Sequence, residues 1–254
     1  AENIDEALDI FEKTMDSTYS VAWINSTKNQ ENIGQSIIMI GEHASIDDLD
    51  KKKSLNPLNL KVRKKRNIPF YFPNWFLNKK LVKLFNSAYY YIGKKNLNEK
   101  LVYWDDYFYP LDNILGWNKI YGRKGFLQYQ CVIPLRNSKE GLIELLKELE
   151  KSKVCSFLSV LKRFGNQNGK FSFPIEGYTI ALDFPVSNET LKLLEKLDEI
   201  TLKYGGRFYL AKDARMNKEI FKKSDSRVKN YIDFRKKNNC HKNFNSSQSN
   251  RLEI

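Results

Sequence analysis

Four segments in the second half of the chain have hydrophobic patterns typical of β-strands. Residues 127–134 alternate between apolar and polar side chains, and residues 178–186 do so as well. Because successive side chains of a strand point to opposite faces, this alternation predicts strands with one face in the core. Residues 155–164 and 207–211 are short apolar runs that we also interpret as strands.

Two helices are predicted between these strands, each with leucines along one face. The first runs over residues 138–151, where Asn137 and Ser138 can cap its start. The second runs over residues 188–204 and ends at Gly205-Gly206, as a left-handed C-cap requires. The leucines expected to face the core are Leu142, Leu145, Leu146, Leu149, Leu191, Leu194 and Leu197.

The resulting order is strand, helix, strand, strand, helix, strand. This is the split βαβ arrangement, an antiparallel sheet with both helices on one face. We therefore predict an α+β fold with a ferredoxin-like core.

In such a fold one sheet face packs on the helices and the other carries no helix. The apolar sets of the first and third strands should meet the helices, which leaves a more polar set on the other face. That set comprises Gln128, Gln130, Thr179, Ala181 and Asp183. Small and amide side chains can form the floor of a ligand site, or an ordinary polar face under a loop. Both sets of the second strand contain apolar residues, and Lys162 near its end could project toward the floor.

The rest of the chain gives weaker patterns. We expect helices over residues 3–15, 79–91 and 217–235, a strand over 35–40, and a polar loop over 238–250. Residues 47–66 are charged and predict a surface excursion. Residues 103–109 are aromatic and acidic and stop at Pro110. Asp105-Asp106 is only a weak candidate for a pair of acid/base residues, because adjacent residues of a strand point to opposite faces.

The net charge of +13 comes from 43 basic and 30 acidic residues. Such a balance favours anionic partners, either nucleic acid, a phosphate-bearing substrate or an anionic membrane surface. A composition rich in lysine and asparagine and spread over solvated faces is the favoured explanation. Aromatic and basic residues mix at 61–75, which could form a stacking platform for single-stranded nucleic acid. No RNP-like string is present, and aromatics that line the core or a pocket are the favoured interpretation.

Several kinds of site have no motif in this sequence. There is no Gly-rich dinucleotide or P-loop motif, no His-Glu-x-x-His and no Gly-x-Ser-x-Gly. Gly165 and Gly169 predict a turn. Cys131, Cys155 and Cys240 have no paired spacing, and only two histidines occur, so we expect neither a disulfide framework nor a metal site. No apolar window reaches the length of a membrane span, and no signal peptide is visible.

An ordered set of motifs carries a resemblance to a known family. It runs through Tyr109-Pro-Leu-Asp112, Trp117-Asn118, Tyr121-Gly122, Gly125-Phe-Leu-Gln-Tyr-Gln130, Val132-Ile-Pro134, Ser156-Phe-Leu, Lys162, Phe164-Gly165, Phe171-Ser-Phe-Pro174, Asp183-Phe-Pro185, Gly205-Gly-Arg-Phe-Tyr209, Ala211-Lys-Asp213, Arg215 and Arg251-Leu-Glu. The chain thereby resembles the decaprenylphosphoryl-β-D-ribose 2-oxidase-like FAD-linked oxidoreductases, which are flavoproteins of the vanillyl-alcohol-oxidase type. The match is dense over residues 103–215 and thinner before them.

The resemblance implies a division of the chain. Residues 1–206 would be the substrate-binding domain, and residues 207–254 a segment that returns to the FAD domain. The part that cradles most of the FAD would precede Ala1, so this fragment alone is expected to be inactive.

The resemblance also implies site residues and partners. The substrate side of the flavin would be lined by Trp23, Gln128, Gln130, Lys162, Phe164, Thr179 and Ala181. Tyr209 and Lys212 would contact the flavin, and no catalytic residue is assigned. The implied partners are a sugar or lipid-linked sugar, with room for a reductase or epimerase subunit. The implied location is cytoplasmic, with peripheral membrane association allowed, and nucleic acid is disfavoured.

The chain departs from the family pattern inside the implied pocket. The pattern has Trp-Asn-x-Cys where this chain has Tyr178-Thr179-Ile180-Ala181, and His in place of Tyr109. The leading hypothesis is therefore an FAD-dependent oxidoreductase acting on CH-OH of a sugar or polyprenyl-phosphate sugar, with the substrate itself left open. The alternative is a non-enzymatic, basic nucleic-acid-binding module.

Overall fold

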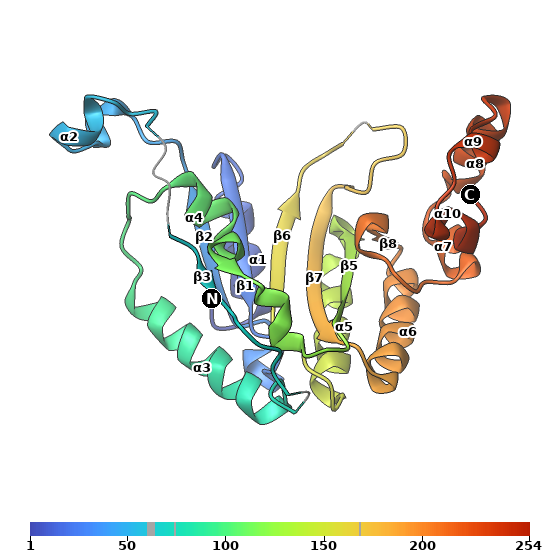
Figure 1. Cartoon of the computed structure of the whole chain (residues 1–254), viewed down its shortest axis with the longest axis horizontal. Coiled ribbons are helices and arrows are strands. Elements are labelled where there is room, and N and C mark those ends of the chain that lie inside the picture. The colour runs from blue at the N-terminus through green and yellow to red at the C-terminus, as the bar shows by residue number, and fades with distance from the viewer. Residues whose placement is uncertain (60–63, 74, 168) are drawn as a thin grey trace.

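The architecture is α+β, with one six-stranded antiparallel sheet and helices packed against it (Figure 1). The computed structural model describes residues 1–59, 64–73, 75–167 and 169–254. The predicted α+β class, with an antiparallel sheet and helices, is confirmed, whereas its finer part, a split βαβ, ferredoxin-like core with the helices on one face, stays a prediction.

The strand order of the sheet is β2-β1-β6-β7-β5-β8. All five neighbouring pairs run antiparallel. The strands are β1 (Tyr19–Ile24), β2 (Ser36–Gly41), β5 (Phe126–Pro134), β6 (Ser159–Phe164), β7 (Gly177–Pro185) and β8 (Arg207–Phe208). A separate parallel pair joins β3 (Arg66–Asn67) to β4 (Ile114–Leu115). The longest ladder, β5 with β7, lies near the middle of the sheet.

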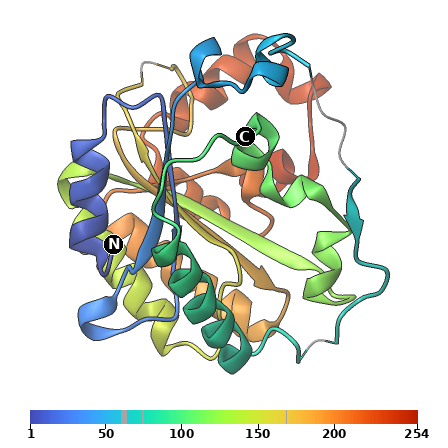
Figure 2. The same ribbon diagram turned by 90° about the vertical axis from the view of Figure 1, so that its left-hand side faces the viewer.

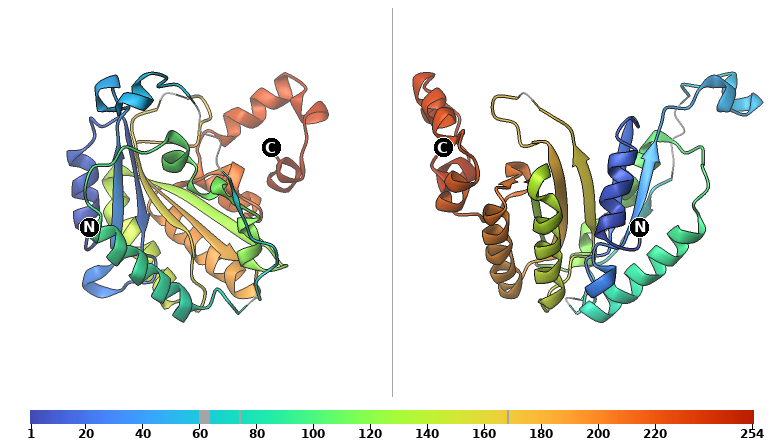
Figure 3. Two further views of the ribbon diagram at one scale, coloured as in Figure 1. Left: turned by 60° about the vertical axis from the view of Figure 1, so that its left-hand side comes forward. Right: turned by 180° about the vertical axis from the view of Figure 1, so that it is seen from behind.

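Three helices cover one face of the sheet, which we call the inner face. They are α1 (Ile4–Lys13), α5 (Ser138–Lys151) and α6 (Asn188–Lys203), seen side by side from behind in the right panel of Figure 3. The predicted apolar sets meet them, because Cys131, Ile133, Ile180 and Leu182 are fully buried in the same core as the helix leucines. The alternation of β5 and β7 therefore predicted their inward residues correctly.

The ends of these helices follow local chemistry. Asn3 caps α1 by accepting a hydrogen bond from the backbone N–H of Glu6, and Ser187 caps α6 in the same way. Gly205 adopts φ +71°, the left-handed conformation expected after α6. The predicted capping of α5 is wrong, since the Asn137 side chain instead donates to the Tyr204 carbonyl.

A second layer partly covers the opposite face, which we call the outer face. It contains α3 (Lys79–Lys95), α4 (Trp104–Phe108) and the 3-10 turn η4 (Trp117–Tyr121), visible around the sheet in Figure 2. A small apolar cluster of Leu77, Val82, Tyr121 and Cys155 anchors it. The strand geometry assumed for Asp105 and Asp106 is thus wrong, because both lie in α4.

The C-terminal helices project from the β8 side of the molecule (Figure 1). They are α7 (Lys218–Ser224), α8 (Val228–Lys237), α9 (Cys240–Asn243) and α10 (Ser247–Leu252). Their buried residues Phe221, Val228 and Leu252 belong to the main core. The prediction of a loop over residues 238–250 is wrong, and the predicted 217–235 helix is two helices.

Two predicted strands are shorter than expected. β6 begins at Ser159 because Cys155 packs into the second cluster. β8 ends at Phe208, after which Leu210–Lys212 form the 3-10 turn η6. The remaining short elements are α2 (Lys51–Ser54), η1 (Gln30–Asn32), η2 (Ile46–Asp48), η3 (Pro110–Asn113) and η5 (Leu135–Asn137).

Some sequence predictions fall outside the described residues. Residues 61–63 and 74 belong to the basic and aromatic stretch 61–75, residue 60 to the predicted surface excursion 47–66, and residue 168 to the turn between Gly165 and Gly169. Among the described helices, none is long and apolar enough to cross a membrane.

Candidate functional site

The register of the sheet places predicted site residues in one row on the outer face. Trp23 of β1 lies opposite Val160 of β6, which lies opposite Ala181 of β7, which lies opposite Gln130 of β5. Directly paired residues of antiparallel strands point to the same face. The row therefore crosses four strands with one large ring, two small side chains and one amide.

Neighbouring rows hold the remaining strand residues. Lys162 is paired with Thr179, and Gln128 is paired with Asp183. Phe164 lies two residues after Lys162 and so shares its face. All seven residues expected to line the substrate side thus lie on the outer face, as strand parity requires.

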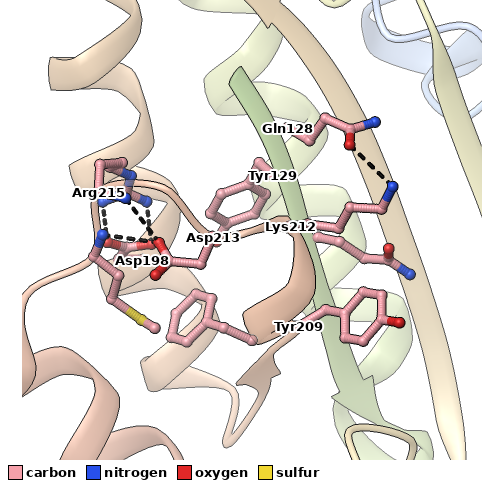
Figure 4. A pocket seen from close by; sticks show the side chains of 10 residues that line it. Gln128, Tyr129, Asp198, Tyr209, Lys212, Asp213 and Arg215 are labelled. Atoms are coloured by element: carbon pink, nitrogen blue, oxygen red, sulfur yellow. Dashed lines mark hydrogen bonds and ion pairs between the residues drawn. The ribbon is translucent and has the colours of Figure 1, made fainter. Parts of the chain in front are cut away.

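A hydrogen-bonded chain joins the sheet to the turn η6. The Lys212 Nζ donates to Gln128 Oε1 at 2.9 Å, and Gln128 Nε2 donates to Asp183 Oδ1 at 2.9 Å. Figure 4 shows Lys212 reaching across β5 to Gln128. Both ends of the Gln128 amide are occupied, so this side chain holds the ammonium group in place.

Asp183 is the buried end of that chain. Its side chain is 3 % exposed, and Oδ2 has no hydrogen-bond partner among the described residues. Burial raises the pKa of Asp183 to about 6, while the hydrogen bond from Gln128 and the charge of Lys212 act in the opposite direction. The hydroxyl of Tyr121 is also buried without a partner in the described structure, and burial and the charge of Asp183 raise its pKa.

Gln130 is fixed from beneath by Thr179. Gln130 Nε2 donates to Thr179 Oγ1 at 3.1 Å, and that hydroxyl donates to the Cys131 carbonyl at 2.8 Å. Thr179 is almost fully buried, so it positions Gln130 more directly than it meets a ligand. Gln130 remains half-buried at the surface.

Aromatic rings border the other end of the outer face. The Tyr209 ring stacks on Phe173 at 4.7 Å between centroids, and Phe173 meets Phe164 edge to face at 5.9 Å. The backbone N–H of Tyr209 donates to the Gln130 carbonyl, which holds Tyr209 beside β5. Sequence reasoning did not assign Phe173 to the site, although it stands inside the Phe171–Pro174 motif of the resemblance.

A pocket opens around the edge of β5 beside η6 (Figure 4). It is lined by Gln128, Tyr129, Gln130, Asp198, Phe208, Tyr209, Lys212, Asp213, Arg215 and Met216. On its inner side, Arg215 Nη1 and Nη2 contact both oxygens of Asp198, at 2.5 and 2.7 Å. Sequence reasoning had named Arg215 and Asp213 only as motif residues. In the structure Arg215 ties the segment after η6 to α6, and the Asp213 carboxylate accepts from the backbone N–H groups of Arg215 and Met216.

The β1 end of the site is covered by α3. The Trp23 side chain is 6 % exposed and packs against Tyr89 of α3 at 4.7 Å between ring centroids. Lys162, in contrast, is exposed at the surface of the sheet. The outer face therefore has an apolar end at Trp23, amides in its centre and an ammonium group at Lys212.

These features define the class of site. A partly enclosed sheet face with fixed amides, aromatic rings and a tethered cation suits a polar organic ligand that carries or gains negative charge. Among the described residues, no group of histidine, cysteine, aspartate or glutamate side chains could hold a metal ion.

The comparisons give that class a particular relative. The chain is 32 % identical to the decaprenylphosphoryl-beta-D-ribose oxidase of Mycolicibacterium smegmatis over 238 residues, which is 93 % of this chain and 51 % of that protein. It is 31 % identical to an uncharacterized protein in the mprA 5'region of Streptomyces coelicolor over 99 residues, which is 38 % of this chain and 27 % of that protein. The chain thus spans about half the length, or less, of these curated relatives. No protein-family model matches it.

Proposed function

We propose that this chain is the substrate-side part of an FAD-dependent oxidoreductase. In this proposal the enzyme oxidises a hydroxyl of a sugar or polyprenyl-phosphate sugar, and the flavin, when bound, supplies the hydride acceptor at N5. The similarity to a named oxidase over 93 % of the chain supports an oxidoreductase-related role. We also propose that β5 to β8 with α5 and α6 act as a split βαβ substrate domain.

The observation that carries the proposal is the shared outer face. Seven residues from β1, β5, β6 and β7 lie on it, with Tyr209 and Lys212 beside it. The family resemblance implied this set, and the alternation of β5 and β7 independently implied four of its members. A ligand above the uncovered part of this face would lie beside Gln128, Gln130 and Lys162, while α3 covers Trp23 at its β1 end.

The residues present fit the negatively charged side of a reduced cofactor. Lys212 is a fixed cation, because its ammonium group donates a hydrogen bond to Gln128 Oε1 and Gln128 is itself anchored on Asp183. A fixed positive charge stabilises developing negative charge without reorganisation of the site. Tyr209 contributes a ring held by Phe173 and by a backbone bond to β5. We propose that the main dinucleotide cradle lies outside these 254 residues.

The substrate side has its own polar groups. Gln130 is held by Thr179 through its amide nitrogen, and we propose that its amide oxygen accepts a hydrogen bond from a sugar hydroxyl. Lys162 is exposed on the same face, where an ammonium group can bind a phosphate. Ala181 and Val160 have small side chains at the centre of the row, so the ring of a sugar can approach the sheet closely.

The nucleic-acid alternative has less support from this face. Sheet-based RNA-binding modules stack bases on aromatic side chains of their central strands. The central strands here present Gln128, Gln130, Thr179 and Ala181 instead. These residues favour a polar organic ligand over a stacked base.

The decisive variant concerns Lys212 in the full-length protein that contains this chain. Lys212→Met removes the charge and retains the length of the side chain, whereas Lys212→Arg keeps the charge. We expect Lys212→Met to lower kcat for sugar oxidation by about 10²-fold, because one preformed electrostatic contact is lost. Lys212→Arg should retain more activity. Steady-state kinetics with an artificial electron acceptor and lipid-linked pentoses would measure both.

A matched control is Lys192→Met, on the exposed surface of α6. It should leave kcat unchanged. Equal kcat for Lys212→Met and the parent would contradict the proposed role of Lys212.

A further inference from the structure

Helix α3 exposes a largely uncovered apolar stripe, in which Phe85 also contacts Phe157 at 5.0 Å between ring centroids. Val82 and Asn86 are its buried residues, and both point toward the molecule. The residues with large apolar side chains that remain exposed are Leu81 at 39 %, Leu84 at 67 %, Phe85 at 44 %, Tyr89 at 40 %, Tyr91 at 59 % and Ile92 at 60 %, of which Tyr89 turns toward Trp23. Their spacings of three, four and seven residues place most of them along one side of the helix.

Lysines flank this stripe. The helix carries Lys79, Lys80, Lys83, Lys94 and Lys95 and contains no aspartate or glutamate. Lys94 pairs with Glu2, and Lys79 contacts the Glu150 carbonyl. Lys80 and Lys83 are exposed and form no ion pair with the described residues. The outward surface of α3 is therefore both apolar and positively charged.

We propose that α3 docks on an anionic membrane surface and lies in its interface. Helices of this kind place aromatic and aliphatic residues at the boundary of the acyl chains, while lysines reach the anionic head groups. Charge complementarity selects this occupant, since each lysine near an anionic leaflet adds to binding. A helix that bound RNA would have less use for exposed Leu81, Leu84 and Ile92.

The residues next to α3 extend the same surface. Trp75, which precedes the helix, is 68 % exposed, and indole rings favour the level of the head groups. A separate exposed pair, Leu55 and Leu58 at 87 % and 89 %, follows the basic helix α2, which lies at the upper end of the molecule in Figure 1 while α3 lies at the lower end.

The position of α3 connects this surface to the candidate site. Tyr89 of α3 packs against Trp23, and Trp23 begins the outer-face row that ends at Gln130. A lipid-linked sugar could therefore keep its chain in the membrane while its head group reaches the outer face. This last step rests on the proposed function, whereas membrane docking itself does not.

The test is co-sedimentation of vesicles with the full-length protein that contains this chain. Phosphatidylcholine vesicles would be compared with vesicles in which about one third of the lipid is phosphatidylglycerol. The protein should sediment with the anionic vesicles and should stay in the supernatant when the vesicles are neutral. The double variant Lys80→Glu with Lys83→Glu should weaken partitioning by at least about tenfold, and Leu84→Ser with Ile92→Ser should weaken it by a similar factor.

The control variant changes net charge equally on the opposite side of the molecule. Lys147→Glu with Lys192→Glu alters exposed positions of α5 and α6 and should retain binding within about threefold. Circular dichroism would verify that each variant is folded.

Several outcomes would overturn the proposal. Equal losses in the α3 and control lysine variants would mean that only net charge matters. Full binding by the Leu84 and Ile92 variant would exclude insertion of the stripe. Binding of single-stranded RNA would be measured on the same variants. If the Lys80 and Lys83 variant lost RNA binding but still bound vesicles, nucleic acid would be the favoured partner of α3. Because no assay here uses flavin, failure would leave the proposed oxidoreductase function standing.

Discussion

At the scale of single residues, the candidate site depends on groups fixed by partners that the sequence does not reveal. Gln128 and Gln130 could be placed on the outer face because strand residues alternate. Their separate partners, Asp183 with Lys212 and Thr179 with the Cys131 carbonyl, depend on register and rotamers. Phe173 could not be assigned from pattern because its contact with Tyr209 joins residues far apart in sequence.

Asp183 should make stability depend on pH. Its pKa in the folded chain is about 6, above its usual value, so its stabilising contribution is complete below about pH 4 and is lost as pH rises through about 6. Such a rise corresponds to about 3 kcal/mol. Asp183→Asn stays neutral, so the difference in unfolding free energy between variant and parent should shift by about that amount in favour of the variant between about pH 4 and pH 8.

Urea unfolding at several pH values would measure this difference. The exposed Asp47→Asn variant, on η2, is the matched control and should show no such shift. If the difference in unfolding free energy between Asp183→Asn and the parent stayed constant with pH, the raised pKa of Asp183 would be contradicted.

At the scale of elements, local pattern predicted the central strands and helices but missed their margins. The alternation in β5 and β7 and the leucine faces of α5 and α6 are strong signals because these elements face one core. β8 stops after two residues because the chain turns into η6 at Leu210. The backbone N–H of Tyr209 still donates to the Gln130 carbonyl of β5. The polar tail forms α10 because Ser246 and Ser249 cap each other, a signal that resembles a loop in composition.

The ion pair between Asp198 and Arg215 joins α6 to the segment after η6. Removing one partner of this pair should strongly destabilise the fold. Asp198 is 2 % exposed and pairs with Arg215, which also donates to the Leu194 carbonyl. Asp198→Leu leaves a largely buried guanidinium without its partner, and we expect a loss of about 3–5 kcal/mol. Chemical denaturation would measure this loss.

The double variant Asp198→Leu with Arg215→Met provides the control for that experiment. It removes both charges, so it should be less destabilised than Asp198→Leu alone. If the double variant lost the sum of the two single losses, the pair would not be coupled as the distances indicate.

At the scale of the whole molecule, the helices leave the outer face accessible from one side. The inner face is closed by α1, α5 and α6, and α3 covers one end of the outer face (Figure 3). The main core continues past residue 206 into Met216, Phe221 and Val228. The division at 206 remains a prediction from the resemblance, since sequence pattern alone does not specify where one functional unit ends.

The central claim is that the outer face serves a flavin-dependent oxidation. The most direct measurement is anaerobic mixing of the full-length protein with a polyprenyl-phosphate pentose while the flavin absorbance is followed. We predict a yellow protein whose absorbance bleaches with substrate, and more slowly when the reacting carbinol carbon carries deuterium. Two results would contradict the account: a colourless protein that releases no flavin on denaturation, or a bound flavin whose absorbance no sugar or polyprenyl-phosphate sugar bleaches.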